Sequence, residues 1–171
     1  MVNKELRVAV FLTPAAEDFR YADGIIGELS ARLDAPLFDP HLTVCSGLCA
    51  DPGLLKGVVA EAAHELAPLI LRIRRIGCSE EFFRTLYIEF EPDPLLTSLR
   101  ERVAGLVERP DNGGFLPHLS LLYREMPLAE KEALAQGLIL DRTELIFDTL
   151  KIVTPSNIQE GWRDTLSWNT L

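Results

Sequence analysis

The sequence predicts an α+β protein made of two similar halves. Three observations support this prediction: the composition, the interleaving of strand-like and helix-like segments, and the repetition of one order of elements. The 171 residues are 47% apolar and 25% charged, which is typical of a globular domain. We expect one bilobal domain over residues 1–171. It would have two mainly antiparallel sheets on either side of a central cleft and helices on their outer faces.

The first half of the chain begins with a strand and then alternates helices and strands. The opening strand is rich in β-forming residues and ends at a proline. Apolar residues at helical spacing predict the two helices, the second ended by Pro68. The expected elements are a strand at 6–14, a helix at 15–33, a strand from 41, a helix at 51–68 and strands at 70–77 and 82–92.

The second half repeats the order helix, strand, helix, two strands. Its first helix has Asp93 as a suitable N-cap and Pro94 at the first helical position. A turn rich in glycine then leads into a second strand that carries a histidine. The expected elements are a helix at 93–109, a turn at 110–114, a strand around 118, a helix at 127–138 and strands at 143–155 and 162–171. We interpret this order as an internal duplication.

The charge and hydropathy of the chain exclude some classes of partner. The net charge is −9, whereas proteins that follow a long nucleic acid normally carry a basic patch. A small phosphorylated ligand remains compatible, because a pocket can be positive inside an acidic protein. No apolar run approaches the about 18 residues of a membrane span, and the first residues lack a secretory signal. We therefore expect a monomeric cytoplasmic protein that binds no membrane.

The three cysteines also favour a cytoplasmic setting. An odd number without a dense framework predicts reduced thiols. Cys45 and Cys49 are four positions apart, a spacing that can indicate a metal site, but no second pair of ligands stands at a suitable spacing. Small buried thiols are the better interpretation. We expect neither a metal nor a cofactor.

One short pattern occurs in both halves: Phe-x-Pro-His-Leu followed by Thr or Ser, at 38–43 and 115–120. Because side chains alternate along a strand, His41 and Thr43 share a face, and so do His118 and Ser120. The aliphatic residues between them point to the other face. A single histidine on a strand is usually structural, but two copies with a hydroxyl at the same offset favour a functional site.

Two such strands facing each other across a groove would present two imidazoles and two hydroxyls. Imidazole titrates near neutral pH, so one ring can be neutral while the other is charged. In-line hydrolysis of a phosphodiester needs such a pair, a base that takes a proton from water and an acid that gives one to the departing oxygen. The hydroxyls can donate to the phosphate oxygens. This chemistry requires no metal.

The two motifs, HLTV from His41 and HLSLLY from His118, resemble the signature of the 2H phosphoesterase superfamily. The opening strand VAVFLTP, the segment FFRTLYIEF and the closing strand with its tryptophan are similar to the cyclic phosphodiesterase branch of plants and yeast. The resemblance implies two lobes around a cleft and metal-independent hydrolysis. The implied substrates are ADP-ribose 1″,2″-cyclic phosphate, opened to the 1″-phosphate, and nucleoside 2′,3′-cyclic phosphates, opened to the 2′-phosphate.

The resemblance also implies roles for individual residues. His41 and His118 would be the acid–base pair, and Thr43 and Ser120 would bind the phosphate. Tyr123 falls where the family has an aromatic residue that lines the pocket. Phe11 falls near a family position that is often tryptophan, which stacks on a base. We assign His118 as the base and His41 as the acid, and the sequence leaves open the exchange of the two roles.

Two of the candidates have a second interpretation. Tyr123 follows His118 by five positions, so a regular strand would place it on the opposite face, in the core, unless the strand bends. Arg84 alternates with apolar residues, and its guanidinium either reaches the cleft to bind phosphate or extends to the sheet edge. The sequence leaves both questions open.

The leading hypothesis is a metal-independent cyclic phosphodiesterase that acts on a small cyclic phosphate nucleotide. A second hypothesis is an RNA-processing enzyme that cleaves terminal 2′,3′-cyclic phosphates or 2′-5′ linkages. This activity predicts a basic track and a steep salt dependence. A third hypothesis is a nucleotide-binding module without catalytic activity.

Overall fold

The structure is a computed structural model that describes residues 6–107, 114–155 and 168–170. Its elements are β1 (Leu6–Pro14), α1 (Ala16–Leu33), β2 (Leu42–Cys49), α2 (Pro52–Glu65), β3 (Leu69–Cys78), the 3₁₀ turn η1 (Phe82–Arg84), β4 (Leu86–Phe90), α3 (Pro94–Ala104), β5 (His118–Leu122), α4 (Leu128–Gly137), β6 (Glu144–Pro155) and β7 (Trp168–Thr170). The predicted order of helices and strands is confirmed. Most of the expected turn at 110–114, and residues 162–167 and 171 of the closing strand, lie outside the described residues.

Two helices begin with the same Asp-Pro pair. The side chain of Asp51 accepts a hydrogen bond of 2.9 Å from the backbone N–H of Leu54 at the start of α2. Asp93 accepts one of 2.9 Å from Leu96 at the start of α3, as the sequence predicts. Each bond satisfies a backbone donor that the first turn of a helix leaves without a partner.

The strand expected over residues 82–92 is shorter than predicted, because its first residues form the turn η1. The hydroxyl of Thr85 donates to the carbonyl oxygen of Phe82 at 2.9 Å, and the Ser79 hydroxyl donates to that of Arg84 at 2.7 Å. These local side-chain bonds compete with strand pairing. Arg84 therefore does not lie on a strand, and the alternation that assigned it to an apolar face does not apply.

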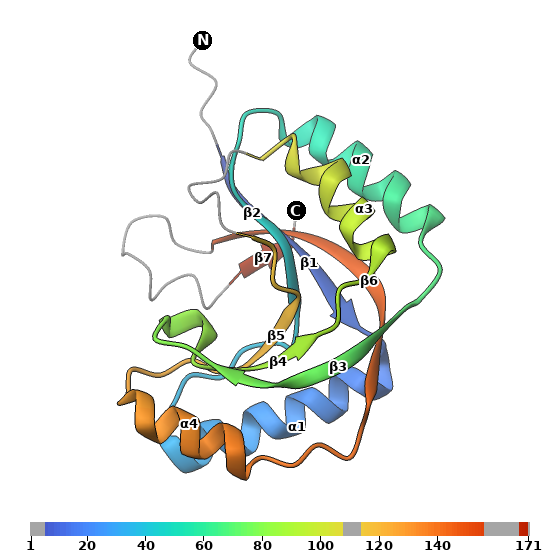
Figure 1. Ribbon diagram of the computed structural model, residues 1–171. Helices are drawn as coiled ribbons and strands as arrows, with labels where there is room; N and C mark the ends of the chain where they lie inside the picture. Colours follow the sequence, from blue (N-terminus) through green and yellow to red (C-terminus); the bar gives the residue numbers. More distant parts are fainter. Residues whose placement is uncertain (1–5, 108–113, 156–167, 171) are drawn as a thin grey trace.

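The described strands form one antiparallel sheet in the order β1-β2-β5-β4-β3-β6-β7. Strand β1 also pairs with β6, so six strands close into a ring (Figure 1). Strand β7 pairs with the last residues of β6, Val153 to Pro155. The two halves of this ring are joined by short stretches of strand pairing. Leu42 pairs with Leu119 between β2 and β5, and residues 69–72 of β3 pair with β6. Hydrogen bonding thus unites what the sequence predicts as two separate sheets.

Strand pairing follows the same pattern in both halves of the chain. The first half is β1-α1-β2-α2-β3 and the second is β4-α3-β5-α4-β6. Exchanging the halves turns the β1–β2 pair into β4–β5 and the β1–β6 pair into β4–β3, while β2–β5 and β3–β6 map onto themselves. The repeating unit therefore begins at β1, one strand earlier than the sequence pattern suggests.

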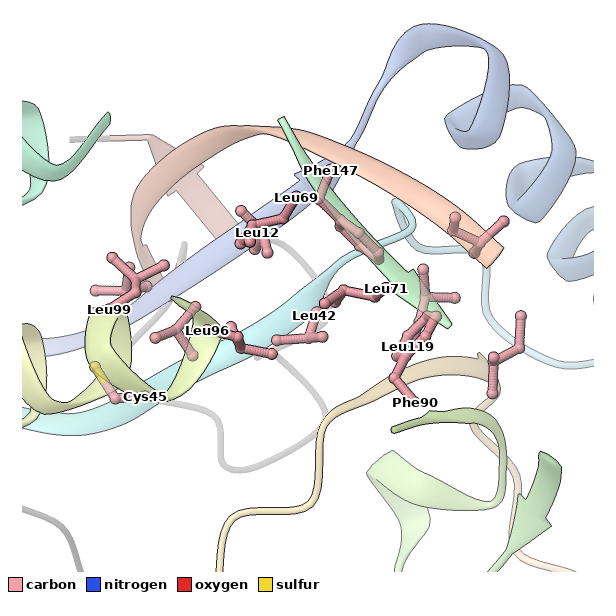
Figure 2. Close-up of a cluster of buried hydrophobic side chains, with 14 of the residues drawn as sticks. Leu12, Leu42, Cys45, Leu69, Leu71, Phe90, Leu96, Leu99, Leu119 and Phe147 are labelled. Carbon is pink, nitrogen blue, oxygen red and sulfur yellow. The ribbon is translucent and has the colours of Figure 1, made fainter. Parts of the chain in front are cut away.

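The helices cover the outer side of the ring and bury the main hydrophobic core. Helices α2 and α3 pack on each other and on β6 and β2, whereas α1 packs on β5 and β1 and α4 on β3 and β4 (Figure 1). The core under them contains Leu12, Leu42, Phe90, Leu96, Leu119 and Phe147 (Figure 2). Cys45 and Cys49 are buried in it, as expected of small structural thiols. Within the described part of the chain, no helix is long and apolar enough to cross a membrane.

The opposite side of the sheet has a different composition. Along β1, Val8, Val10 and Leu12 point into the main core, while Ala9 and Phe11 form a separate small cluster with Val153 of β6. Alternation along neighbouring strands places the polar residues of both histidine motifs on this second side.

Candidate active site

The candidate site is centred on the contact between β2 and β5. Leu42 and Leu119 pair directly across these strands, and both side chains are fully buried in the main core. Extending this antiparallel register by one position sets His41 opposite Ser120 and Thr43 opposite His118. All four side chains then share the face away from the core. The two histidines are diagonal neighbours, a relation in which side chains are about 7–8 Å apart at their bases.

Both imidazoles are held by the same hydrogen bond. Nδ1 of His41 lies 2.7 Å from the carbonyl oxygen of Asp39, and Nδ1 of His118 lies 2.8 Å from that of Leu116. A carbonyl oxygen can only accept, so each Nδ1 carries a hydrogen and donates it. In the neutral ring, Nε2 then has a free lone pair. A proline separates each histidine from the residue whose carbonyl accepts its bond. Pro40 and Pro117 restrict the residues before them to an extended conformation, which fixes the position of the accepting carbonyl.

The surroundings of both rings disfavour the imidazolium form. Burial lowers the pKa of His41 to about 4, against the opposing hydrogen bond to Asp39, and the charge of His118 lowers it further. Burial also lowers the pKa of His118, as does Arg84, while the bond to Leu116 opposes this. Both rings are therefore neutral at pH 7 in the free protein, and they are close enough to sense each other's charge.

An aromatic ring supports each imidazole. Phe11 of β1 stacks on His41 with the ring centres 3.9 Å apart and an angle of 21° between the planes. Tyr87 of β4 approaches His118 edge-on at 5.4 Å and 70°. The two aromatic residues occupy equivalent places, because Phe11 pairs with Thr43 and Tyr87 pairs with Ser120 in the sheet. Phe11 is buried and supports His41 with its ring.

A glycine makes room for Tyr87. Gly77 of β3 lies opposite Tyr87 in the sheet, and a Cβ atom placed on it would lie 2.5 Å from Cζ of the tyrosine ring. Any larger residue at position 77 would therefore clash with the tyrosine ring. Sequence reasoning missed Tyr87, although its place one strand before the second histidine motif mirrors that of Phe11 before the first.

The two hydroxyl groups of the motifs have different surroundings. The buried Ser120 hydroxyl donates a hydrogen bond of 2.8 Å to the carbonyl oxygen of Phe83, so it anchors the turn η1 against β5. Thr43 is half-buried, and within the described residues no hydrogen bond engages its hydroxyl. Thr43 therefore has the hydroxyl that is ready to donate to a ligand, while Ser120 would have to exchange partners.

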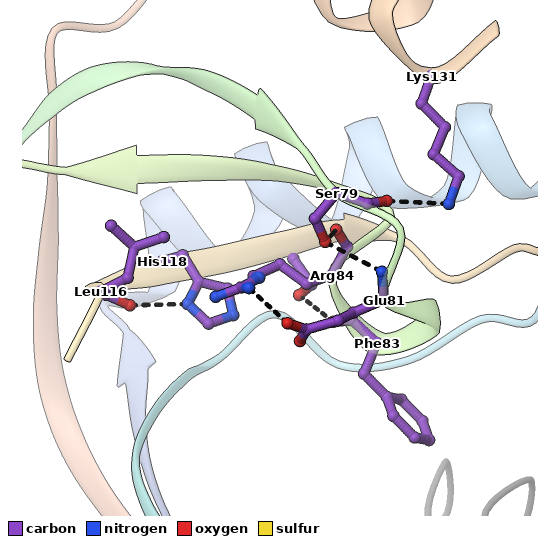
Figure 3. A network of polar contacts seen from close by, with 8 residues as sticks. Ser79, Glu81, Phe83, Arg84, Leu116, His118 and Lys131 are labelled. Carbon is purple, nitrogen blue, oxygen red and sulfur yellow. Dashed lines mark hydrogen bonds and ion pairs between the residues drawn. The ribbon is translucent and has the colours of Figure 1, made fainter. Parts of the chain in front are cut away.

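Arg84 brings a positive charge to the second histidine. Its Cζ atom lies 5.8 Å from the ring centre of Tyr87, and Figure 3 shows its guanidinium beside the His118 ring. One terminal nitrogen donates to Glu81 at 2.6 Å. Its buried Nε atom has no hydrogen-bond partner among the described residues. Arg84 thus lies beside His118 and Tyr87 at the candidate site.

Tyr123 lies in a buried aromatic cluster next to the site. It follows the last residue of β5, is buried, and stacks on Phe38 with ring centres 3.8 Å apart. Phe82 and Phe83 of η1 complete this aromatic cluster, and burial raises the pKa of the Tyr123 phenol well above its usual value. The register of β5 against β4 is irregular here, because Leu122 pairs with Leu86 and Ser120 with the next residue, Tyr87. The Ser120 side chain also hydrogen-bonds the Tyr123 phenol, which opposes the rise in its pKa, so Tyr123 contacts a residue of the candidate site as well as the aromatic cluster.

A buried carboxylate, also missed from the sequence, completes the polar surroundings of His118. Glu89 of β4 pairs with His118 in the sheet. It accepts a hydrogen bond of 2.7 Å from Nε of Arg75 and one of 3.1 Å from Arg74. Two arginines thus compensate the buried charge. No cluster of three or more His, Cys, Asp or Glu side chains in the described ranges could hold a metal ion.

Comparisons with known proteins agree with the resemblance of the motifs. The model of one family, described as cyclic phosphodiesterase-like protein, matches residues 6–169. A protein of Kluyveromyces lactis named 2′,3′-cyclic-nucleotide 3′-phosphodiesterase is 27% identical over 147 residues. This match covers 77% of the present chain and 66% of the relative, so the chain spans slightly less than two thirds of that protein.

Similar folds occur among solved structures. E. coli LigT in apo form superposes with a TM-score of 0.60 at 16% identity, covering 98% of this chain and 95% of LigT. LigT complexed with 3′-AMP gives 0.61 at 14% identity, with 98% and 96% covered. Usb1 of Kluyveromyces marxianus gives 0.55 at 12% identity, with 88% and 95% covered. At these identities the likeness concerns the fold.

Proposed function

We propose that this chain, which belongs to the cyclic phosphodiesterase-like protein family, hydrolyses a small cyclic phosphate ester between His41 and His118. The substrates are ADP-ribose 1″,2″-cyclic phosphate, opened to the 1″-phosphate, and nucleoside 2′,3′-cyclic phosphates, opened to the 2′-phosphate. The observation that carries the proposal is the β2–β5 pair, which makes the two imidazoles diagonal neighbours with both Nδ1 atoms anchored. The name of the Kluyveromyces lactis relative supports the substrate class.

The reaction is an in-line displacement at phosphorus. One imidazole takes a proton from water as the new P–O bond forms, and the other gives a proton to the ester oxygen as its P–O bond breaks. We assign the base to His118, because burial lowers its pKa, as does Arg84, and so keeps the ring neutral and able to accept a proton, while Glu81 and Glu89 offset part of the cost of the imidazolium that forms. We assign the acid to His41, because the desolvation that lowers its pKa to about 4 makes its imidazolium a ready proton donor. The charge of the bound phosphate favours protonation of one ring.

The remaining residues of the site bind the phosphate. The Thr43 hydroxyl and the guanidinium of Arg84 donate to the non-bridging oxygens, where negative charge develops. The Nε of Arg84, which has no hydrogen-bond partner in the described part of the chain, supports this role. Ser120 holds η1, and with it Arg84, in place through its bond to Phe83, and its hydroxyl serves as a further phosphate donor when it exchanges partners. Phe11 and Tyr123 contribute by packing, Phe11 against His41 and Tyr123 beneath η1.

The direct test is an activity assay in the presence of EDTA. Purified protein is incubated with ADP-ribose 1″,2″-cyclic phosphate and the four nucleoside 2′,3′-cyclic phosphates, and the products are identified. We expect hydrolysis without added metal. His41→Ala and His118→Ala each lower kcat by about 10²–10⁴-fold, the usual contribution of an acid or base. His64→Ala, on the exposed side of α2, serves as the control and retains activity. Inactivity on all five substrates would refute the proposal.

One observation favours a second activity, the cleavage of 2′,3′-cyclic or 2′-5′ ends of RNA. Arg74 and Arg75 are largely exposed on β3, next to the strand that pairs with His118. They provide a short basic surface beside the site. RNA cleavage predicts that kcat/KM falls steeply as salt rises, whereas a small substrate predicts a weak dependence. A module that only binds nucleotides would bind a 2′-nucleotide in calorimetry and show no turnover.

We also propose that residues 1–171 form one duplicated domain with two lobes. The closed ring takes three strands from each half, and α1 and α3 each pack on a strand of the other half. The halves therefore depend on each other for folding. A monomeric, cytoplasmic state completes the proposal, and the reduced thiols of Cys49 and Cys78 support the cytoplasmic part of it.

A further inference from the structure

We propose that Lys151 binds a second phosphate group of the substrate, one ribose ring away from the cyclic ester. This inference deepens the proposed function by naming a substrate class, nucleotides that carry a 5′-phosphate or 5′-pyrophosphate besides the cyclic phosphate. It rests on the position of Lys151 in the sheet, on its charge surroundings and on a difference between the two halves of the chain.

The strand register places Lys151 on the same face as the histidines. Lys151 of β6 pairs with Phe11 of β1, and Phe11 pairs with Thr43 of β2. The three residues thus form a row across adjacent strands. Strands lie about 4.8 Å apart, so the backbone at Lys151 is about 10 Å from that at Thr43. A lysine side chain can extend its apolar stem along the Phe11 edge and carry the ammonium toward the rim of the site.

The charge of Lys151 is available for an anion. Its side chain is half-buried, and in the described part of the chain no carboxylate lies within ion-pair distance of its ammonium group. The arginines on the other side of the site are each paired with a carboxylate. Glu89 accepts bonds from Arg74 and Arg75, and Glu81 accepts one from Arg84. Among the described residues, Lys151 on the β6 side is therefore a cation that no carboxylate neutralises, and a second phosphate can bind there.

The two halves of the sheet differ at this position. Exchanging the halves maps Lys151, which pairs with Phe11, onto Gly77, which pairs with Tyr87. Gly77 has no side chain, and the Tyr87 ring occupies the space that a Cβ atom would need. A nearly symmetric pair of imidazoles would accept a cyclic phosphate in two orientations. A cation on one side selects the orientation in which the second phosphate points toward β6.

The experiment compares two substrates that differ by one phosphate. They are adenosine 2′,3′-cyclic phosphate and its 5′-phosphorylated form, with ADP-ribose 1″,2″-cyclic phosphate as a third. We expect the wild type to prefer the 5′-phosphorylated compound. Lys151→Met, which keeps the length of the side chain and removes its charge, lowers kcat/KM for the phosphorylated substrates by about tenfold, the effect of one charge-assisted contact. The variant leaves kcat/KM for adenosine 2′,3′-cyclic phosphate unchanged. Lys56→Met on the exposed face of α2 is the matched control.

A binding measurement separates this inference from the proposed function. Calorimetry with adenosine 2′-monophosphate and adenosine 2′,5′-bisphosphate requires no turnover. Tighter binding of the bisphosphate that is lost in Lys151→Met supports the inference even if the wild type hydrolyses none of the substrates. Equal affinity of the wild type for both compounds overturns it, and so does an equal loss for both in the variant. Activity on plain cyclic nucleotides with no preference for the 5′-phosphate would leave the proposed function standing alone.

Discussion

The two catalytic candidates owe their properties to their immediate neighbours in the sequence. In each motif a proline fixes the carbonyl group that accepts the Nδ1 hydrogen, and this bond leaves Nε2 as the reactive atom. Burial then disfavours the charged form of both rings. These are properties of a base that is ready to accept a proton. The acid must gain its proton either at low pH or from the influence of the bound phosphate.

The lowered pKa values predict an acidic optimum for kcat/KM. The required acid is protonated only below its pKa and is lost as the pH rises through it, while the base is lost as the pH falls through its own pKa. Because burial lowers the pKa of His41 to about 4 and that of His118 also falls below 6.5, kcat/KM should peak below pH 6.5 and decline toward neutrality. The pH profile of kcat should lie at higher pH, because the bound anion raises the pKa values of both histidines. A pH–rate series measures both profiles, and a kcat/KM optimum above pH 7 would contradict this account.

Strand pairing determines which side chains reach the site. Tyr87 meets His118 only because β4 pairs with β5, and its ring finds space only because β3 contributes a glycine. Phe11 and His41 make the equivalent contact through β1 and β2. The turn η1 adds Arg84, and it is held by Lys131 of α4, whose buried ammonium donates to the Ser79 carbonyl at 2.9 Å (Figure 3).

The fit between Gly77 and Tyr87 can be tested by adding one methyl group. Gly77→Ala should displace the Tyr87 ring, whose nearest atoms would lie 2.5 to 2.7 Å from the new Cβ. We expect a loss of about 1–3 kcal/mol in the free energy of unfolding, as for other overpacked sites, together with a lower kcat/KM. Gly24→Ala is the matched control. Its Cβ would meet no atom within 4 Å inside α1, so it should stabilise the protein by about 0.5–1 kcal/mol. Denaturant unfolding checks both, and equal stability of Gly77→Ala and wild type would refute the contact.

Sequence patterns predicted the residues whose roles follow from local spacing. Alternation was sufficient to place His41 with Thr43 and His118 with Ser120, because a period of two fixes the face of a strand. It failed for Arg84, since hydroxyl groups of Ser79 and Thr85 turn that segment into η1. Tyr87 carried no local signal, because a tyrosine in an apolar strand is typical of any core. Its role appears only once the pairing of β4 with β5 is known.

The whole molecule brings together two motifs that are far apart in the chain. The order of elements was predictable, but the closure of the sheet was not, because it depends on β1 pairing with both β2 and β6. Exchanging the two halves of the chain maps the pair of β2 and β5 onto itself. A duplicated motif on these two strands therefore meets its own copy. The two halves differ at Lys151 and Gly77 above all. This difference lets the site select one of the two orientations of a bound substrate.

The most direct test of the central claim is an NMR titration of the histidine side chains with adenosine 2′-monophosphate. The chain has three histidines, and the third, His64, lies exposed on α2 and is an internal control. If one phosphate binds between the two imidazoles, the nucleotide raises the pKa of both His41 and His118, and the His64 resonance does not respond. A response of only one of the two motif histidines, or of neither at saturation, would contradict the account.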